Sequence, residues 1–234
     1  MSEAEFPVDR EHPPRAVRYR GAPCAFTLRP WGMGDIEAQV ALLHASAPEL
    51  KAFMPWIHNP VTVESQYQVT RRFQSAYWEG RDYVFGVFAE DGAPMGAGGL
   101  HSRTPLNPAA LEIGYWCGTP HSGKGLTTAV ARCLVALAFD WLGADRVQLG
   151  HDTANAKSRR IAEKCGFHRE GTIRKAIAEP PLRFRDEGFI ATTDVVMYGL
   201  CREDLAALAW LADVRASMTI VDALGRERAG VRKR

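Results

Sequence analysis

The sequence lacks an apolar run long enough to cross a membrane, which takes about 20 residues. The best candidate, residues 129–142, is interrupted by Arg132 and Asp140. Residues 1–15 carry acidic groups and prolines in place of the basic and apolar regions of a secretion signal. From these absences we expect a cytoplasmic protein with no membrane partner.

The sequence also lacks a large excess of charge of one sign. The 29 Lys and Arg residues nearly balance 27 Asp and Glu residues, so the formal net charge is only +2. This excess is too small to indicate a nucleic acid as a partner. The five cysteines form no Cys-x-x-Cys pair, which argues against a zinc site and against a disulfide framework. We therefore expect no metal, and reduced thiols packed as small hydrophobic side chains.

What is present is the composition of a globular protein, with 46% hydrophobic and 24% charged residues. Residues 1–24 combine prolines with mixed charges, and we predict a flexible N-terminal arm there. Residues 25–204 are expected to form one domain. Beyond it, apolar positions at helical spacing and a basic end predict a C-terminal helix and tail over residues 205–234.

Hydrophobic periodicity predicts strands and helices in an irregular order. Helices are expected over residues 34–47, 63–78 and 154–167, and over an apolar stripe that starts at Leu126. Short apolar runs predict strands at residues 25–30, 83–90, 94–101, 109–117, 145–151 and 194–200. This is not the strict alternation of a doubly wound nucleotide fold. We expect an α/β protein of the α+β type, with helices on a mixed sheet.

A glycine-rich turn, GTPHSGKGLTT, occupies residues 118–128 before the apolar helix. Its spacing approaches a nucleotide-binding P-loop, but Gly125 stands where a Ser or Thr should ligate magnesium. An ATPase is therefore the weaker interpretation. Backbone N–H groups at the positive end of a helix bind phosphate without a metal, and Gly123 and Gly125 would let that backbone approach a pyrophosphate closely.

Sequences on both sides of this turn carry a family resemblance. The stretches LEIGYW (111–116), GKG (123–125) and NAKSRRIAEKCGF (155–167) resemble the GNAT acetyltransferase superfamily, and within it the RimJ/RimL-like branch of ribosomal-protein N-terminal acetyltransferases. FMPW at Phe53 and DVVMYGLCREDL at Asp194 are similar to the same branch. The resemblance implies a splayed mixed sheet of about seven strands with about four flanking helices.

The resemblance also implies acetyl-CoA as the co-substrate, with its pyrophosphate on the glycine-rich turn and its pantetheine along the preceding strand. The cofactor-binding residues that it implies are Tyr115, Trp116, Cys117, Ser122, Gly123, Lys124, Gly125, Leu126, Thr127, Asn155 and Ser158. Two positions depart from the family. Pro120 replaces a frequent Gln or Arg, and Ala162 replaces the tyrosine that many members use as an acid.

Acetyl transfer to an amine needs a base that removes the ammonium proton. Glu112 is our predicted base, because superfamily members often place a glutamate on this strand; a structural carboxylate is the alternative. Relatives also use a carboxylate near the position of Ile177, and Glu179 lies two residues beyond it. His151, which titrates in the useful range, is a third candidate in the same cleft by analogy.

The departing CoA thiolate needs an acid. Ser158 matches the serine of the branch, three residues after Asn155, and is our predicted acid; ordinary capping of a helix is the alternative. Tyr198 on the last strand is a reserve acid or a core tyrosine. On the acceptor side, Met54 and Trp56 are expected to help wall the amine pocket, with His151 beside them.

The function that follows from the resemblance is N-acetyl transfer from acetyl-CoA to a primary amine in a ternary complex. A peptide or protein N-terminal α-amine is the preferred acceptor. A small-molecule amine, such as an antibiotic or polyamine, remains open because fold and cofactor site say little about the acceptor. A non-catalytic acyl-CoA-binding module is a further alternative, and the C-terminal apolar stripe leaves a homodimer open.

Overall fold

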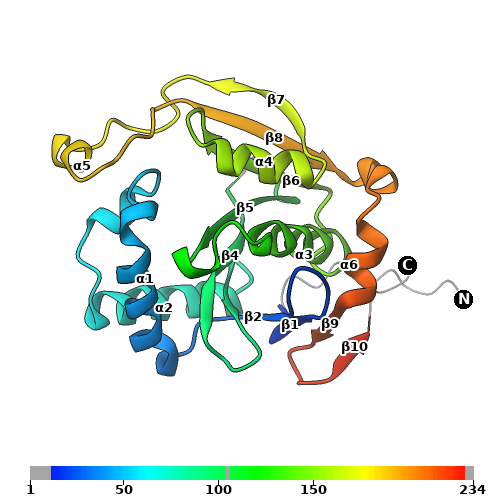
Figure 1. The fold of residues 1–234 in the computed structure, drawn as a ribbon. Helices are drawn as coiled ribbons and strands as arrows, with labels where there is room; N and C mark the ends of the chain where they lie inside the picture. Colours follow the sequence, from blue (N-terminus) through cyan, green and yellow to red (C-terminus); the bar gives the residue numbers. More distant parts are fainter. Residues whose placement is uncertain (1–11, 104–105, 230–234) are drawn as a thin grey trace, which may run out of the picture.

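The computed structural model describes residues 12–103 and 106–229. These residues form one ten-stranded sheet in the order β10-β9-β1-β2-β3-β4-β5-β6-β8-β7, shown in Figure 1. Only β5 and β6 pair in parallel in this sheet. The strands are β1 Ala16–Tyr19, β2 Phe26–Arg29, β3 Asp82–Phe88, β4 Pro94–His101, β5 Ala110–Cys117, β6 Arg146–Asp152, β7 His168–Ile173, β8 Val195–Cys201, β9 Met218–Val221 and β10 Glu227–Ala229.

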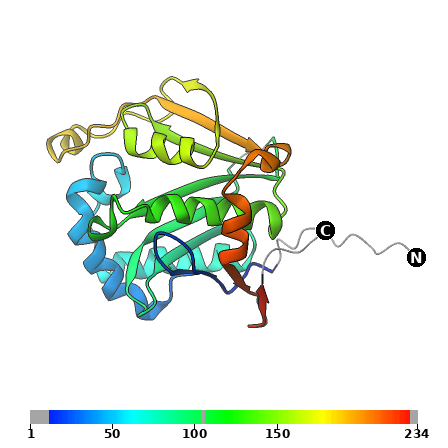
Figure 2. The same cartoon turned by 45° about the vertical axis from the view of Figure 1, so that its right-hand side comes forward.

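Four longer helices and two short ones flank the sheet in the described ranges. They are α1 Ile36–Leu50, α2 Val63–Trp78, α3 Leu126–Asp140, α4 Ala156–Lys164, α5 Leu182–Asp186 and α6 Leu211–Ser217. Nearly all of α3 is buried, as its predicted apolar stripe requires, and in Figures 1 and 2 it runs across the front of the sheet. None of the helices in the described residues is long and apolar enough to cross a membrane.

The two faces of the sheet have different covers. A Cβ atom at Gly98 would lie 3.0 Å from side chains of Leu134 and Val130, so this face of β4 meets α3. On the opposite face, the ring of Trp116 packs against an apolar cluster that includes Leu43 of α1. Residues of β5 alternate between the two faces, so each functional side chain belongs to the α3 face or to the α1 face.

The sheet is splayed between β5 and β6, as the resemblance implies. Their parallel pairing covers only residues 110–112 with 146–148. Further along, β5 pairs with β4 as far as Cys117, and β6 pairs with β8 as far as Asp152. The β6-facing edge of β5 after Glu112 therefore has no strand partner among the described residues.

The chain ends differ from the prediction. Residues 16–19 of the predicted arm form β1, which lies between β2 and β9. The predicted helix and tail contain α6, but residues 218–221 and 227–229 form β9 and β10. Short strands in charged segments show little periodicity, which explains why the local patterns predicted only six strands and missed β1, β7, β9 and β10. The sheet also has more strands than the seven or so that the resemblance implies. Residues 1–11 of the arm and 230–234 of the tail lie outside the described residues.

Candidate active site

The glycine-rich turn delivers free backbone donors at the start of α3. Gly123 and Gly125 have φ angles of 76° and 86°, a left-handed conformation that favours glycine. Gly125 is the N-cap of α3 and has no side chain with which to cap the first turn of the helix. The first N–H groups of a helix have no partner within the helix, so this end of α3 suits an anion.

The predicted phosphate-binding residues lie together in this turn. Nothing lies within 4 Å of a Cβ placed at Gly123, so space is open beside the backbone. The ammonium of Lys124 donates a hydrogen bond to the carbonyl of Pro120 at 2.8 Å and thereby closes the turn on itself. Ser122 precedes the two glycines, while Leu126 is buried in the core.

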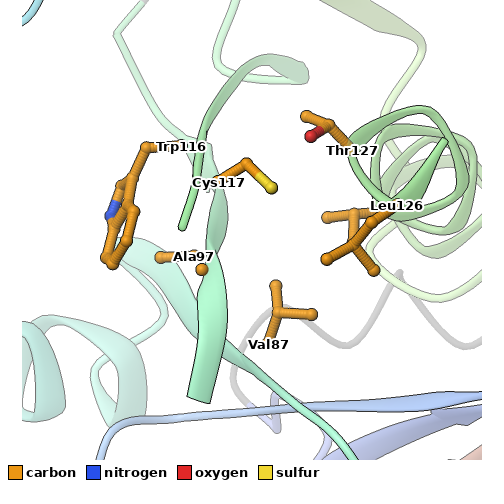
Figure 3. A pocket seen from close by; sticks show the side chains of 8 residues that line it. Val87, Ala97, Trp116, Cys117, Leu126 and Thr127 are labelled. Carbon is orange, nitrogen blue, oxygen red and sulfur yellow. The ribbon is translucent and has the colours of Figure 1, made fainter. Parts of the chain in front are cut away.

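A small pocket separates the end of β5 from the first turn of α3. Its cavity volume is about 10 Å³, room for about one water molecule. In Figure 3 the sulfur of Cys117 and the side chain of Thr127 lie on one side of the strand, and the indole of Trp116 lies on the other. Burial raises the pKa of the Cys117 thiol, although a hydrogen bond with Thr127 opposes this. The thiol is therefore held in its neutral, less nucleophilic form.

Two hydroxyl groups meet across the gap between β5 and β6. The hydroxyl of Tyr115 on β5 lies 2.8 Å from Oγ of Ser158 on α4. Asn155 caps the same helix, because its side-chain oxygen accepts the backbone N–H of Ser158 at 3.0 Å. Burial raises the pKa of Tyr115 well above its usual range, more than the Ser158 hydrogen bond lowers it. Both hydroxyls thus keep their protons.

His151 and Tyr198 occupy the α3 face, away from Glu112. The Nδ1 atom of His151 lies 2.7 Å from the carbonyl of Asp152, and the imidazole ring centroid lies 5.4 Å from that of Tyr198. The buried Nε2 has no hydrogen-bond partner in the part of the chain that the structure describes. The structure therefore does not bring His151 into the cleft of Glu112, because strand alternation turns it to the other face.

Glu112 lies on the α1 face at the point where β5 and β6 separate. Its carboxylate accepts a hydrogen bond from the Gln148 amide at 3.1 Å and lies 3.6 Å from the guanidinium of Arg103. About a quarter of the side chain, 25%, is exposed. This arrangement suits either of the roles considered for Glu112.

The acceptor side contains the predicted wall residues Met54 and Trp56. It also contains a segment that the sequence did not indicate, residues 182–191. The indole of Trp56 is exposed, and its ring centroid lies 6.3 Å from that of Trp116, whereas Met54 packs into the α1 cluster. Figures 1 and 2 place α5 beside the end of α1. The backbone N–H groups of Ile190 and Ala191 both donate to the carbonyl of Ala52 at 3.1 Å.

This second segment, residues 182–191, is fixed by aromatic and ionic contacts. The imidazole ring of His58 stacks on the ring of Phe184 with centroids 4.2 Å apart. His58 Nδ1 also lies 3.0 Å from the carboxylate of Glu187, which Lys51 contacts at 2.7 Å. Phe184 and Phe189 within a charged stretch were the available signal, because buried aromatics in a connection indicate packing.

Sequence reasoning also missed a histidine–aspartate pair on the α1 face. His101 at the end of β4 lies opposite Glu112 on β5. Its Nδ1 atom is 2.6 Å from the carboxylate of Asp82 on β3. Among the residues that the structure describes, no group of three or more His, Cys, Asp or Glu side chains could hold a metal ion.

Comparison with known proteins identifies similar sequences. Residues 25–168 match the family model described as an acetyltransferase (GNAT) domain. The "Probable N-acetyltransferase YjcK" of Bacillus subtilis is 32% identical over 152 residues, which cover 64% of this chain and 84% of that protein. The "Putative ribosomal N-acetyltransferase YdaF" of Bacillus subtilis is 39% identical over 87 residues, 37% of this chain and 47% of that protein.

A solved structure gives the same result at the level of the fold. Mycobacterium smegmatis RimJ, in complex with CoA-disulfide, superposes with a TM-score of 0.73 at 20% sequence identity. The match covers 88% of this chain and 96% of that chain.

Proposed function

The chain belongs to the GNAT family of acetyltransferases, and from this premise we propose that it acetylates the N-terminal α-amine of a peptide or protein. That the protein is an acetyl-CoA-dependent N-acetyltransferase follows from its family. The acceptor class is supported by the name of YdaF, a putative ribosomal N-acetyltransferase.

One structural observation supports the acetyl-CoA site of the proposed enzyme: the unpaired edge of β5 leads directly to the N-terminus of α3, where no side chain caps the helix. Backbone groups of β5 after Glu112 are available to the amides of pantetheine, and the N–H groups at Gly125 and Leu126 to a pyrophosphate. When bound, acetyl-CoA supplies an acetyl group activated as a thioester. The residues of the glycine-rich turn fit its pyrophosphate, because Gly123 has no side chain and the space beside its backbone is open.

The hydroxyl pair is our proposed acid. Ser158 and Tyr115 lie on the two sides of the gap, and their 2.8 Å contact allows one hydroxyl to support the other as a donor. Ala162 stands where many family members have a tyrosine. We propose that the Tyr115 hydroxyl, which reaches α4 from β5, takes the place of that tyrosine. Since burial keeps Tyr115 protonated, its hydroxyl can donate a hydrogen bond to a thiolate or to Ser158.

The acceptor amine is proposed to enter on the α1 face, between Trp56 and the end of β5. An α-amine has a pKa of about 7.7–8.0 and is partly unprotonated at neutral pH. Holding it beside the thioester converts a bimolecular step into an intramolecular one. Glu112 is the base predicted from the sequence, but both Gln148 and Arg103 already contact its carboxylate.

The experiment combines calorimetry with a thiol-release screen. We expect the protein to bind coenzyme A. We also expect it to release thiol from acetyl-CoA when peptides with a free N-terminal α-amine are added, and to do so more slowly with polyamines or aminoglycosides. Transfer to small amines alone would contradict the proposed acceptor. Binding without transfer to any amine would favour the acyl-CoA-binding module.

A matched pair of glycine variants tests the phosphate site. Gly123 and Gly92 both have positive φ, and a Cβ at either would meet nothing within 4 Å. An alanine therefore brings the same kind of backbone strain to both turns, but only Gly123→Ala places a methyl group beside the proposed pyrophosphate. We expect Gly123→Ala to weaken coenzyme A binding about tenfold or more, about 1.4 kcal/mol, and Gly92→Ala to leave the dissociation constant unchanged.

A further inference from the structure

Three neighbouring strands place ionisable side chains in one row on the α1 face. Asp82 of β3 lies opposite His101 of β4, and His101 lies opposite Glu112 of β5. Side chains of directly opposed residues are about 5 Å apart at Cβ. The His101 imidazole is 14% exposed, so it is largely buried but keeps some access to solvent.

Two glycines determine where the imidazole lies. A Cβ at Gly114 would be 2.9 Å from Nε2 of His101, and a Cβ at Gly99 would be 3.1 Å from the same atom. Gly99 and Gly114 are opposed residues, and the next opposed pair on the same face, toward the C-terminal end of β5, is Ala97 with Trp116. The ring therefore extends along the sheet, over the two glycines and toward the end of β5 that leads into the glycine-rich turn.

The aspartate determines which nitrogen can accept a proton. The contact of 2.6 Å between Asp82 and Nδ1 of His101 requires a proton on Nδ1 when the carboxylate is ionised. In neutral imidazole the lone pair is then on Nε2. No hydrogen bond from a described residue to Nε2 is present. A carboxylate that orients the imidazole and stabilises its protonated form is the arrangement of a general base.

We propose that His101, oriented by Asp82, is the base that accepts the proton of the acceptor ammonium, in the place assigned to Glu112 by resemblance. This inference rests on the proposed function. Nε2 takes one proton as the N–H bond of the ammonium breaks, and the freed lone pair forms a bond to the acetyl carbon while the C–S bond breaks. The nitrogen loses its second proton as the amide forms, the sulfur gains one, and His101 passes its proton to solvent.

Charged groups of both signs lie around His101. Asp82 contacts it directly, and Glu112 is its neighbour on β5. Positive groups lie one step further away. Arg103 contacts Glu112 at 3.6 Å, and three arginines line a hollow of about 720 Å³ together with Asp82. These arginines are Arg71, Arg72 and Arg81.

The kinetic test measures kcat/KM against pH with a peptide acceptor. We expect His101→Gln to lose about 10²-fold at pH 6.5, and to recover as the pH rises above the pKa of the α-amine, about 8, where no base is needed. Asp82→Asn should show a smaller loss with the same trend. Glu112→Gln should lose much less than His101→Gln at pH 6.5.

Matched variants separate catalysis from folding. Gly114→Ala pushes the imidazole away without removing it and should reproduce part of the loss, whereas Gly171→Ala, where a Cβ meets nothing within 4 Å, should not. His168→Gln, at the far edge strand β7, is the histidine control. A wild-type profile for His101→Gln, or a loss of the same factor at every pH, would overturn the inference, since the second result indicates a structural role.

Nuclear magnetic resonance of ¹⁵N-labelled histidine gives a readout independent of transfer. The neutral form of His101 should carry its proton on Nδ1, and Asp82→Asn should remove that preference. A proton on Nε2 in the wild type would overturn the inference even if acetyl transfer is confirmed. Failure of the wild type to bind coenzyme A would instead contradict the proposed function and leave the tautomer measurement intact.

Discussion

At the scale of single residues, the hydroxyls of Tyr115 and Ser158, which meet between β5 and α4, can be tested directly by mutation. Ser158→Ala removes one of them and leaves the Tyr115 hydroxyl without its contact at 2.8 Å. If the pair supplies the thiolate proton, kcat should fall about tenfold to a hundredfold with little change in KM. Steady-state kinetics with a fixed peptide measure both constants.

The control for this prediction is Tyr198→Phe. Tyr198 is buried and packs on His151, so removing its hydroxyl should change kcat much less than Ser158→Ala. The reverse order, with Tyr198→Phe slow and Ser158→Ala unaffected, would make the reserve acid the acid of the reaction.

The residues of the glycine-rich turn could be predicted from the sequence, whereas the pairing of His101 with Asp82 could not. Residues 122–127 are contiguous and carry their glycine spacing openly. His101 and Asp82 are 19 residues apart, and they meet only because a particular hairpin register aligns β3 with β4. A slip of one residue would turn His101 to the other face. His151 was expected in the cleft of Glu112 by analogy, and strand alternation places it on the other face.

At the scale of elements, the turn between β9 and β10 is organised by Asp222. Burial alone would raise the pKa of Asp222, but hydrogen bonds from the backbone N–H and guanidinium of Arg226 and the backbone N–H of Leu224 lower it to about 2. An Asp in an unfolded chain has a pKa of about 3.9. The ionised carboxylate therefore stabilises the fold above about pH 4, and this contribution is lost as the pH falls toward 2.

Asp222→Asn should accordingly flatten the pH dependence of stability between about pH 4 and pH 2. The measurement is the thermal unfolding midpoint of wild type and variant across this range. Asp91→Asn is the matched control, because Asp91 likewise accepts a backbone N–H in a hairpin turn, that of Ala93. Parallel curves for wild type and Asp222→Asn would contradict the prediction.

Elements with strong local patterns were predictable and the others were not. The apolar stripe of α3 and the strand β5 follow from 3.6-residue and two-residue periods in adjacent stretches. β1 has only four residues, and Val17 is buried because β2 and β9 flank it. Such burial is a product of pairing distant segments, which no local window of sequence contains.

At the scale of the whole molecule, the sheet continues beyond residues 25–204 at both ends of the predicted domain. Ile220 of β9 is 1% exposed and lies opposite Val17 of β1. We propose that β1 and β9 belong to the folding unit. Ile220→Ala should then cost about 2–5 kcal/mol of unfolding free energy, measured by urea denaturation.

Thr219→Ala provides the comparison for this prediction, because Thr219 is the neighbouring residue and its side chain is only partly buried. It should cost less than Ile220→Ala. Equal stability of wild type and Ile220→Ala would show that this end of the chain is an appendage, as the domain boundary at residue 205 predicts.

The gap between β5 and β6 divides the molecule into a larger block, β10 through β5, and a smaller one, β6 through β7. Three opposed residue pairs join the two blocks at the narrow end of this gap. A pantetheine laid along the gap would act as a splint between the blocks. Because the entropic cost of immobilising the two blocks would already be met, an acceptor would bind more tightly to the protein that holds the thioester, and by reciprocity the acceptor would tighten thioester binding.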